Sequence, residues 1–166
     1  MNIKLETLNL VRYNPDKHKY LKEEFKSGNS YSSYIYSIED RLELSKNNNN
    51  NIFHSAFVIE DNTNPIGYLY ISSLKKDIVF LEYAILKDYR KMGYGSKIVN
   101  EISNYLFINN NIKSIKLDID PGNKYSIALA LSCGFTLDYE EYESRNYQGR
   151  MQFVKDNDYY IVKKHK

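Results

Sequence analysis

The sequence predicts a single α/β domain in which an antiparallel set of strands is followed by alternating helices and strands. The chain has 166 residues, close to the length of one ordinary domain. Three strand-like segments separated by turn residues occupy positions 52–86, which predicts an antiparallel meander. After residue 95 the apolar residues change from alternation to a helical spacing, which indicates that a crossover helix follows the meander.

Composition and charge restrict the class of protein. With 42% hydrophobic residues, 27% charged residues and three prolines, the chain is typical of a globular protein. A net charge of +2 disfavours a dedicated nucleic-acid binder. No segment has the apolar length of a membrane span, and the first residues lack the apolar core of a signal peptide. The only cysteine, Cys133, cannot form an intrachain disulfide, so we expect a reduced, cytoplasmic setting.

The first half of the chain is predicted from alternation, turn residues and proline. Leu8 and Leu10 alternate with polar residues, and Pro15 suits the first turn of a helix. The asparagine-rich run before residue 52 predicts a flexible connection. In order, we expect a strand over 5–11, a helix over 15–26, a loop over 28–37, a helix over 38–45, the connection over 47–51, and strands over 52–60, 66–73 and 78–86.

The second half alternates helices and strands. From Ser96 the apolar positions follow one helical face, and three asparagines at 109–111 end that helix. Alternating apolar residues predict a strand over 112–119. Asn123 is a suitable N-cap for a helix that runs through Cys133, with Gly134 as its stop. Two further strands are expected over 136–143 and 159–163.

The segment most indicative of chemistry is Arg90-x-x-Gly93-x-Gly95, which lies between a predicted strand and a predicted helix. Glycines let backbone N–H groups approach a ligand, and a helix N-terminus favours an anion such as a pyrophosphate. Arg90 could add a cationic contact. The alternative is a tight strand-to-helix turn without a ligand. The complete nucleotide-binding motifs, with their further glycines or lysine, do not occur here.

A second motif follows the strand over 112–119: Pro121-x-Asn123-x-x-Ser126, and then Gly134-Phe135. Together the two motifs resemble those of the GNAT (GCN5-related N-acetyltransferase) superfamily, over about residues 52–135. The second motif is similar to that of its RimJ/RimL-like branch, which acetylates ribosomal-protein N-termini. This resemblance implies a mixed central sheet of about seven strands flanked by about four helices. Two splayed parallel strands, ending at Leu86 and Ile119, would form the acetyl-CoA cleft.

The resemblance also implies which residues bind acetyl-CoA. Backbone N–H groups of the glycine loop would bind the pyrophosphate, beside Arg90, and the preceding strand would pair with the pantetheine through its backbone. Asn123 would contact the pantetheine or serve only as an N-cap. The loop residues are Met92, Gly93, Tyr94, Gly95 and Ser96, and the strand residues are Ile85 and Lys87.

The catalytic residues are less clearly implied, because two familiar positions differ. Val79 stands where many members carry a glutamate base, and Ala130 where many carry a tyrosine acid. In the ribosomal-protein branch the serine of the second motif is the proposed acid, which here is Ser126. Its alternative role is a first-turn serine that bonds to the backbone. The candidate bases are Glu82, which should face the other side of the sheet from Val79, and Glu141 and Glu143.

The resemblance therefore implies an N-acetyltransferase that moves the acetyl group of acetyl-CoA to a primary amine, by direct attack in a ternary complex. The acceptor would be a protein N-terminus or a small-molecule amine. A homodimer is compatible with the resemblance, and we expect no metal, nucleic acid or membrane partner. Because Val79 and Ala130 replace familiar acid and base residues, a non-catalytic acyl-CoA-binding module of the same fold is the alternative.

Overall fold

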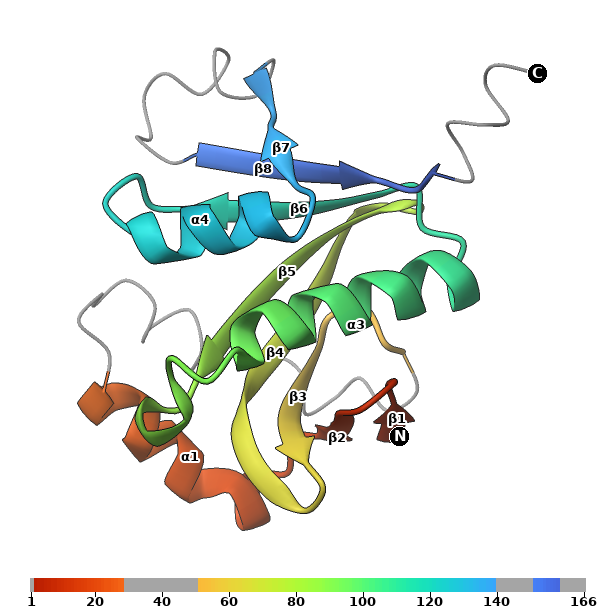
Figure 1. Cartoon of the computed structure of the whole chain (residues 1–166). Coiled ribbons are helices and arrows are strands. Elements are labelled where there is room, and N and C mark those ends of the chain that lie inside the picture. The colour runs from red at the N-terminus through yellow and green to blue at the C-terminus, as the bar shows by residue number, and fades with distance from the viewer. Residues whose placement is uncertain (1, 29–50, 140–150, 159–166) are drawn as a thin grey trace.

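The computed structural model describes residues 2–28, 51–139 and 151–158 (Figure 1). These residues form one eight-stranded sheet, three α-helices and one 3-10 helix. In chain order the elements are β1 (Asn2–Lys4), β2 (Asn9–Arg12), α1 (Pro15–Gly28), β3 (Ser55–Asp61), β4 (Asn64–Lys75), β5 (Ile78–Ile85), η1 (Lys87–Tyr89), α3 (Tyr94–Asn109), β6 (Ser114–Ile119), α4 (Lys124–Ser132), β7 (Thr136–Leu137) and β8 (Met151–Asp156).

The strands lie in the order β1-β2-β3-β4-β5-β6-β8-β7. All neighbouring strands are antiparallel except β5 and β6, which are parallel. A parallel pair needs a crossover connection, and α3 supplies it. The mixed sheet that the sequence predicts is therefore confirmed, with one parallel pair at its centre.

The two parallel strands separate soon after they begin. Pairing between β5 and β6 is limited to Ile78↔Ser114 and the next two positions of each strand. Beyond this point β5 continues beside β4, as far as the pair Gly67↔Ile85, and β6 continues beside β8. Each strand keeps its antiparallel partner while it loses its parallel one. The sheet therefore splits between β5 and β6, as the diverging arrows in Figure 1 show.

The sheet carries a core on each face, because alternate side chains of every strand point to opposite sides. The larger core lies under α3 and α4 and includes Ile59, Leu81 and Leu117. The smaller core lies on the other face, where Leu21 of α1 packs with residues such as Tyr68. The face of the sheet that a side chain belongs to can therefore be assigned from these two clusters.

The N-terminal segment differs from its prediction. Positions 5–11 do not form one strand: β1 and β2 pair as a hairpin, and a turn separates them, closed by a 2.9 Å hydrogen bond from Leu5 N to Leu8 O. The buried carboxylate of Glu101 on α3 accepts hydrogen bonds from the turn N–H groups of Thr7, at 3.0 Å, and Leu8, at 3.1 Å. The acceptor is 94 positions from Thr7 in the sequence, so local pattern could not reveal it.

Most predicted elements are found with small shifts at their ends. The helix over 15–26, the meander, the crossover helix, the strand over 112–119 and the helix after Asn123 are all confirmed. Instead of the strand predicted over 136–143, β7 is only two residues long within the described residues. Strand β8 was not predicted. The loop over 28–37, the helix over 38–45, the strand over 159–163 and nearly all of the asparagine run lie outside the described residues.

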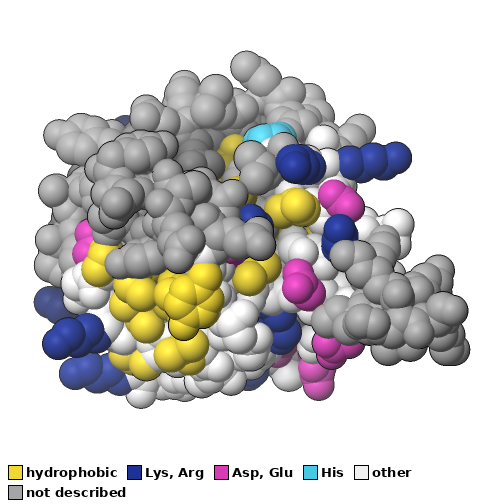
Figure 2. Space-filling model, turned by 90° about the horizontal axis from the view of Figure 1, so that it is seen from above, with side chains coloured by type: hydrophobic (Ala, Val, Ile, Leu, Met, Phe, Trp, Pro, Cys, Tyr) yellow, Lys and Arg dark blue, Asp and Glu magenta, His cyan; other side chains and the backbone are white. Residues whose placement is uncertain are grey.

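Hydrophobic side chains also gather on the surface that Figure 2 shows from above, with charged side chains of both signs around them. Exposed hydrophobic residues of the second half of the chain include Tyr125, Leu131 and Tyr139. Among the described helices, none combines the length and the apolar character that crossing a membrane requires.

Candidate functional site

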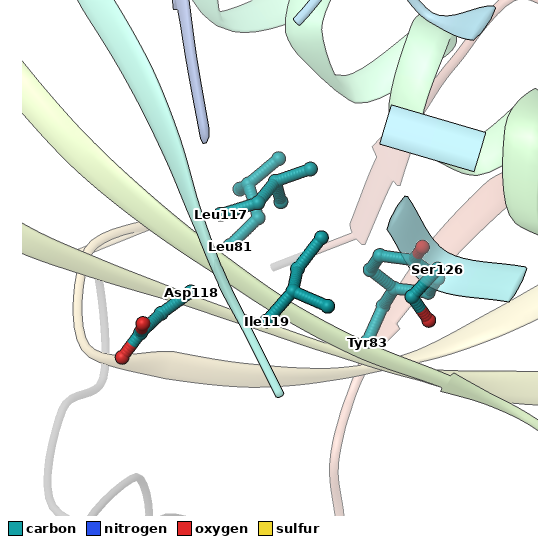
Figure 3. Close-up of a pocket in the computed structure, with 6 residues that line it drawn as sticks. All are labelled: Leu81, Tyr83, Leu117, Asp118, Ile119 and Ser126. Atoms are coloured by element: carbon teal, nitrogen blue, oxygen red, sulfur yellow. The ribbon is translucent and has the colours of Figure 1, made fainter. Parts of the chain in front are cut away.

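A cleft opens where β5 and β6 diverge. Figure 3 shows its six lining residues, which come from β5, β6 and the first turn of α4. Asp118 extends to the opposite side of β6 from its neighbours Leu117 and Ile119. The cleft thus has lining groups on both faces of the sheet. The lining residues are Leu81, Tyr83, Leu117, Asp118, Ile119 and Ser126.

Backbone groups of β5 point into this cleft. Leu86 N–H donates to Ile66 O at 2.8 Å. The backbone N–H and C=O groups of Leu86, and of every second residue before it in β5, therefore face β4. Strand alternation then directs the N–H and C=O groups of Tyr83 and Ile85 toward β6. An extended ligand could lie along this edge as an additional strand would. The predicted residue Ile85 ends β5, whereas Lys87 lies beyond it in η1 and is exposed.

Arg90 holds the end of β5 and the glycine loop together. Its Nε donates a 2.9 Å hydrogen bond to Ile85 O, and the residue is exposed. The side chain of Arg90 therefore has a structural contact in addition to its predicted role beside an anion.

The amino end of α3 is prepared for an anion. Gly93 is its N-cap in the left-handed conformation, with φ of +84°, and no side chain caps the helix. The first N–H groups of a helix have no partner within that helix, and they carry its partial positive charge. The backbone N–H groups of Tyr94, Gly95 and Ser96 therefore lie at the turn where the sequence predicts an anion. Met92, just before it, is 64% exposed.

The two glycines of the loop serve different purposes. A Cβ on Gly93 would meet no atom within 4 Å, so lack of space does not require a glycine at this position. Its positive φ does, because residues with a Cβ rarely adopt that conformation. A Cβ on Gly95 would lie 2.7 Å from Leu129 Cδ1 of α4. Gly95 therefore allows α3 and α4 to pack closely, a role that the motif alone did not indicate.

The side chain of Tyr94 points toward the hairpin between β3 and β4. Its hydroxyl donates to Asp61 Oδ2 at 2.5 Å, and its ring meets the edge of Tyr89 at a centroid distance of 6.2 Å. The hydrogen bond to Asp61 raises the pKa of the Tyr94 hydroxyl. Only the backbone of Tyr94 is thus directed to the predicted anion site. Behind the same turn, the buried Cys133 Sγ lies 3.8 Å from Ser96 O.

The first turn of α4 contains Asn123 and Ser126, and for each of them the sequence left open whether the side chain bonds to the backbone or faces a ligand. The Asn123 side chain accepts a 3.2 Å hydrogen bond from Ser126 N, so Asn123 is the N-cap of α4. The Ser126 hydroxyl lines the cleft and makes no hydrogen bond to any described residue. The backbone-bonding alternative for Ser126 is therefore not what the structure shows.

The candidate bases lie on the other side of the sheet or outside the structure. Glu82 is in register with Tyr70 of the neighbouring strand β4, and Tyr70 belongs to the smaller core. Val79 is buried in the larger core. The predicted difference in parity between Val79 and Glu82 is thus confirmed. Glu141 and Glu143 lie outside the described residues. Val79 and Ala130 are fully buried and have hydrocarbon side chains, so neither position supplies an acid or a base.

Among the polar residues that line the cleft, sequence reasoning missed Tyr83 and Asp118. Tyr83 shares its face of β5 with Leu81, and this parity was a usable signal. Asp118 sits between two buried residues of β6, and only the split of the sheet reveals that it borders a cleft. In the described part of the chain, no group of three or more His, Cys, Asp or Glu side chains is arranged to hold a metal ion.

Comparison with known proteins gives a consistent result. A family model described as "Acetyltransferase (GNAT) family" matches residues 17–135. Among solved structures, a spermidine N-acetyltransferase from Vibrio cholerae in complex with CoA and spermine superposes with a TM-score of 0.69 and 16% identity, covering 93% of this chain and 98% of the other. A ribosomal-protein alanine acetyltransferase from Vibrio fischeri gives 0.66 and 16%, covering 95% and 97%.

A dodecameric spermidine N-acetyltransferase from Vibrio cholerae gives a TM-score of 0.68 and 18% identity, covering 93% of this chain and 96% of the other. At such identities the likeness establishes the fold alone. No curated protein matches the sequence.

Proposed function

The chain belongs to the acetyltransferase (GNAT) family and is an N-acetyltransferase that uses acetyl-CoA; we propose that it acetylates a primary amine by direct attack within a ternary complex. The observation that carries this proposal is the split between β5 and β6, which opens beside the uncapped amino end of α3. The split supplies a strand edge for the extended pantetheine arm of the coenzyme, and the amino end of α3 supplies a site for the coenzyme's pyrophosphate.

In this proposal the coenzyme lies along β5. The backbone N–H groups from Met92 to Ser96 bind the pyrophosphate, with Arg90 beside them. The backbone of Ile85 pairs with the pantetheine, and the Asn123 amide lies at the first turn of α4 on the other lip of the cleft. In this proposed arrangement the reacting sulfur lies near Ser126, which lines the cleft.

Two proton transfers complete the reaction. The neutral amine attacks the thioester carbonyl carbon, the C–S bond breaks, and the departing thiolate takes a proton from the Ser126 hydroxyl, which solvent water reprotonates. Glu82, on the other face of the split, accepts the proton that the amine loses. A strand N–H of β5 stabilises the oxyanion. The enzyme contributes chiefly by positioning the two reactants.

The acceptor is an amine of the small-molecule or protein N-terminal class. Both classes occur among the similar structures, whose names specify spermidine and a ribosomal protein. We further propose that copies of the chain associate, since one similar structure is dodecameric. Light scattering in solution tests this. The buried, free thiol of Cys133 supports a reducing, cytoplasmic setting.

The coenzyme site is tested by a bulky residue at position 93. Gly93→Val should lower the affinity for coenzyme A in calorimetry, because its side chain would enter the open space over the anion turn. Gly134→Val is the matched control, since Gly134 has nearly the same φ, +85°, and lies at the far end of α4. Equal affinity in the parent and Gly93→Val would contradict the site assignment.

The alternative is a non-catalytic acyl-CoA-binding module, favoured by the buried Val79 and Ala130. Incubation with acetyl-CoA and a panel of amines separates the two functions, with thiol release as the readout. The panel contains peptides, polyamines and aminoglycosides. Amine-dependent release of coenzyme A supports the enzyme, whereas tight binding without release supports the module.

A further inference from the structure

The loop that leads into α3 is held at each of its ends by a side-chain hydrogen bond. Before the glycines, Arg90 Nε donates to Ile85 O at 2.9 Å. After the first glycine, the Tyr94 hydroxyl donates to Asp61 Oδ2 at 2.5 Å. Between these contacts Gly93 has a positive φ and open space around it, and no side chain caps the helix. Because glycine is conformationally permissive, the anion turn (residues 92–96) depends on the attachments on either side of it.

The second attachment joins α3 to the hairpin of β3 and β4. Asp61 is the last residue of β3 and is in register with Asn64 of β4, so it belongs to the paired sheet. Tyr94 is the first residue of α3, and its ring meets that of Tyr89 edge to face at a centroid distance of 6.2 Å. A hydroxyl that donates to a carboxylate forms a stronger hydrogen bond than one between neutral groups. We call Tyr94 and Asp61 the tether.

The tether reaches the anion site through the backbone of Tyr94. The N–H of this residue is among the first donors of α3, whereas its side chain points to the hairpin. The Asp61 carboxylate lies beyond the far end of the Tyr94 ring, and as an anion it would repel a pyrophosphate. Neither side chain is therefore a ligand for the pyrophosphate. Their hydrogen bond acts on the coenzyme by fixing the direction of the backbone donors.

We propose that Tyr94 and Asp61 are positioning residues, which hold the backbone donors of the anion turn in place before the coenzyme binds. The inference rests on the proposed function and adds a residue pair that acts on its coenzyme site from a distance. A turn that is already fixed loses little conformational entropy when a ligand binds, so the affinity rises. This gain applies only to a donor that carries a pyrophosphate. The tether thus makes the enzyme select acetyl-CoA over a thioester of the pantetheine arm alone.

The test compares acetyl-CoA with S-acetylpantetheine, which has the same thioester and pantetheine arm but lacks the pyrophosphate. Tyr94→Phe should raise KM for acetyl-CoA by about 3–10-fold, within the usual net contribution of one hydrogen bond, and leave kcat at saturation unchanged. With S-acetylpantetheine, kcat/KM should stay at the parent value. Asp61→Ala should reproduce this pattern. Asp61→Asn should recover part of the affinity, because an amide oxygen also accepts a hydrogen bond.

Tyr105→Phe is the matched control, because it removes a hydroxyl from the same helix, away from the anion turn. It should leave the kinetics with both donors unchanged. The double variant of Tyr94→Phe and Asp61→Ala should lose no more affinity than either single variant, since both changes remove the same hydrogen bond. Additive losses would show that the two side chains act separately, which contradicts the tether.

Calorimetry with coenzyme A and with pantetheine gives the same comparison without turnover. Tyr94→Phe should weaken the binding of coenzyme A and leave that of pantetheine unchanged. Equal losses for both ligands, or a lower melting temperature at unchanged affinity for coenzyme A, would overturn the tether while the acetyltransferase function stands. If coenzyme A binds but no amine releases it from acetyl-CoA, the proposed function fails, and calorimetry still decides on the tether. If the parent does not bind coenzyme A, both fail.

Discussion

At the scale of single residues, the structure separates the backbone N–H of Ser126 from its hydroxyl. Asn123 satisfies the Ser126 N–H, and the hydroxyl remains at the cleft. A helix N-terminus favours a nearby thiolate, and a hydroxyl there can supply its proton. Asn123 therefore caps the helix, and the Ser126 hydroxyl is left for the proton transfer that we propose.

Ser126→Ala should lower kcat by about 10²–10⁴-fold, the usual contribution of a positioned proton donor, with little change in coenzyme affinity or melting temperature. Ser132→Ala, in the last turn of the same helix, is the matched control and should keep full turnover. Steady-state kinetics with calorimetry measure both effects. Unchanged turnover of Ser126→Ala would remove this serine from the mechanism and leave water as the proton source.

His18 makes folding stability depend on pH. Its Nδ1 accepts a 2.8 Å hydrogen bond from Asn14 N, which requires an unprotonated Nδ1. Burial, assisted by the nearby Lys17, lowers the pKa of His18 below 6.5. The unfolded chain then binds a proton more readily than the folded one, so this contribution is present above pH 6.5 and is lost as pH falls.

Urea unfolding between pH 7.5 and pH 5 should therefore show a falling free energy of unfolding, and His18→Gln should reduce that slope. Glutamine can accept the same hydrogen bond and does not titrate in this range. An identical slope in the parent and the variant would assign the pH dependence to other groups.

At the scale of elements, the contact between α3 and α4 fixes how the two sides of the proposed coenzyme site are placed. Gly95 permits this contact, since any Cβ there would collide with Leu129 Cδ1 at 2.7 Å. Both helices pack on the same face of the sheet, so a shift of either would move the anion turn relative to Ser126.

Gly95→Ala should destabilise the fold by about 1–3 kcal/mol through overpacking, and Leu129→Ala by about 2–5 kcal/mol through loss of buried surface. The double variant should be less destabilised than the sum of the two, because each change relieves the defect of the other. Urea denaturation of all four proteins gives the coupling energy. Strict additivity would show that Leu129 is not the residue that requires glycine at position 95.

At the scale of the whole molecule, the sheet consists of two antiparallel parts joined by one short parallel contact. One part contains β1 to β5 and the other contains β6, β8 and β7, with three register pairs between them. The cleft lies at this junction, with the anion turn of α3 on one side and α4 on the other. A ligand in the cleft therefore touches both parts.

Coenzyme A at about 100 times its Kd should stabilise the protein by about 2.7 kcal/mol, if it binds only the folded state. Hydrogen exchange should slow at the amides of Tyr83 and Ile85, whose backbone groups point into the split. Amides of the hairpin between β1 and β2 serve as an internal control. Protection confined to one part of the sheet would contradict a ligand that bridges the two.

Local patterns in the sequence determined much of this protein. Helical spacing, alternation and turn residues predicted the meander, α3, β6 and α4, because these elements follow from the periodicity of their own residues. The two glycines and the Asn123 cap marked the anion turn and the start of α4 for the same reason. The predictions that failed concern segments whose structure does not follow from their own residue pattern. The turn between β1 and β2 depends on Glu101, and β8 carries the buried polar residue Gln152, which weakens its alternation.

Only the tertiary structure decided what borders the cleft. The divergence of β5 from β6 arises because each keeps its own antiparallel partner, and no short segment records that competition. This divergence brings Tyr83 and Ser126 together, and places Glu82 and Asp118 on the opposite face. The tertiary structure also shows that Gly95 is needed where α3 packs on α4. It shows as well that the Asn123 side chain, and not the Ser126 hydroxyl, caps α4. Motifs specify the backbone conformation of a turn, whereas the side chains that meet across a split sheet are set by contacts distant in sequence.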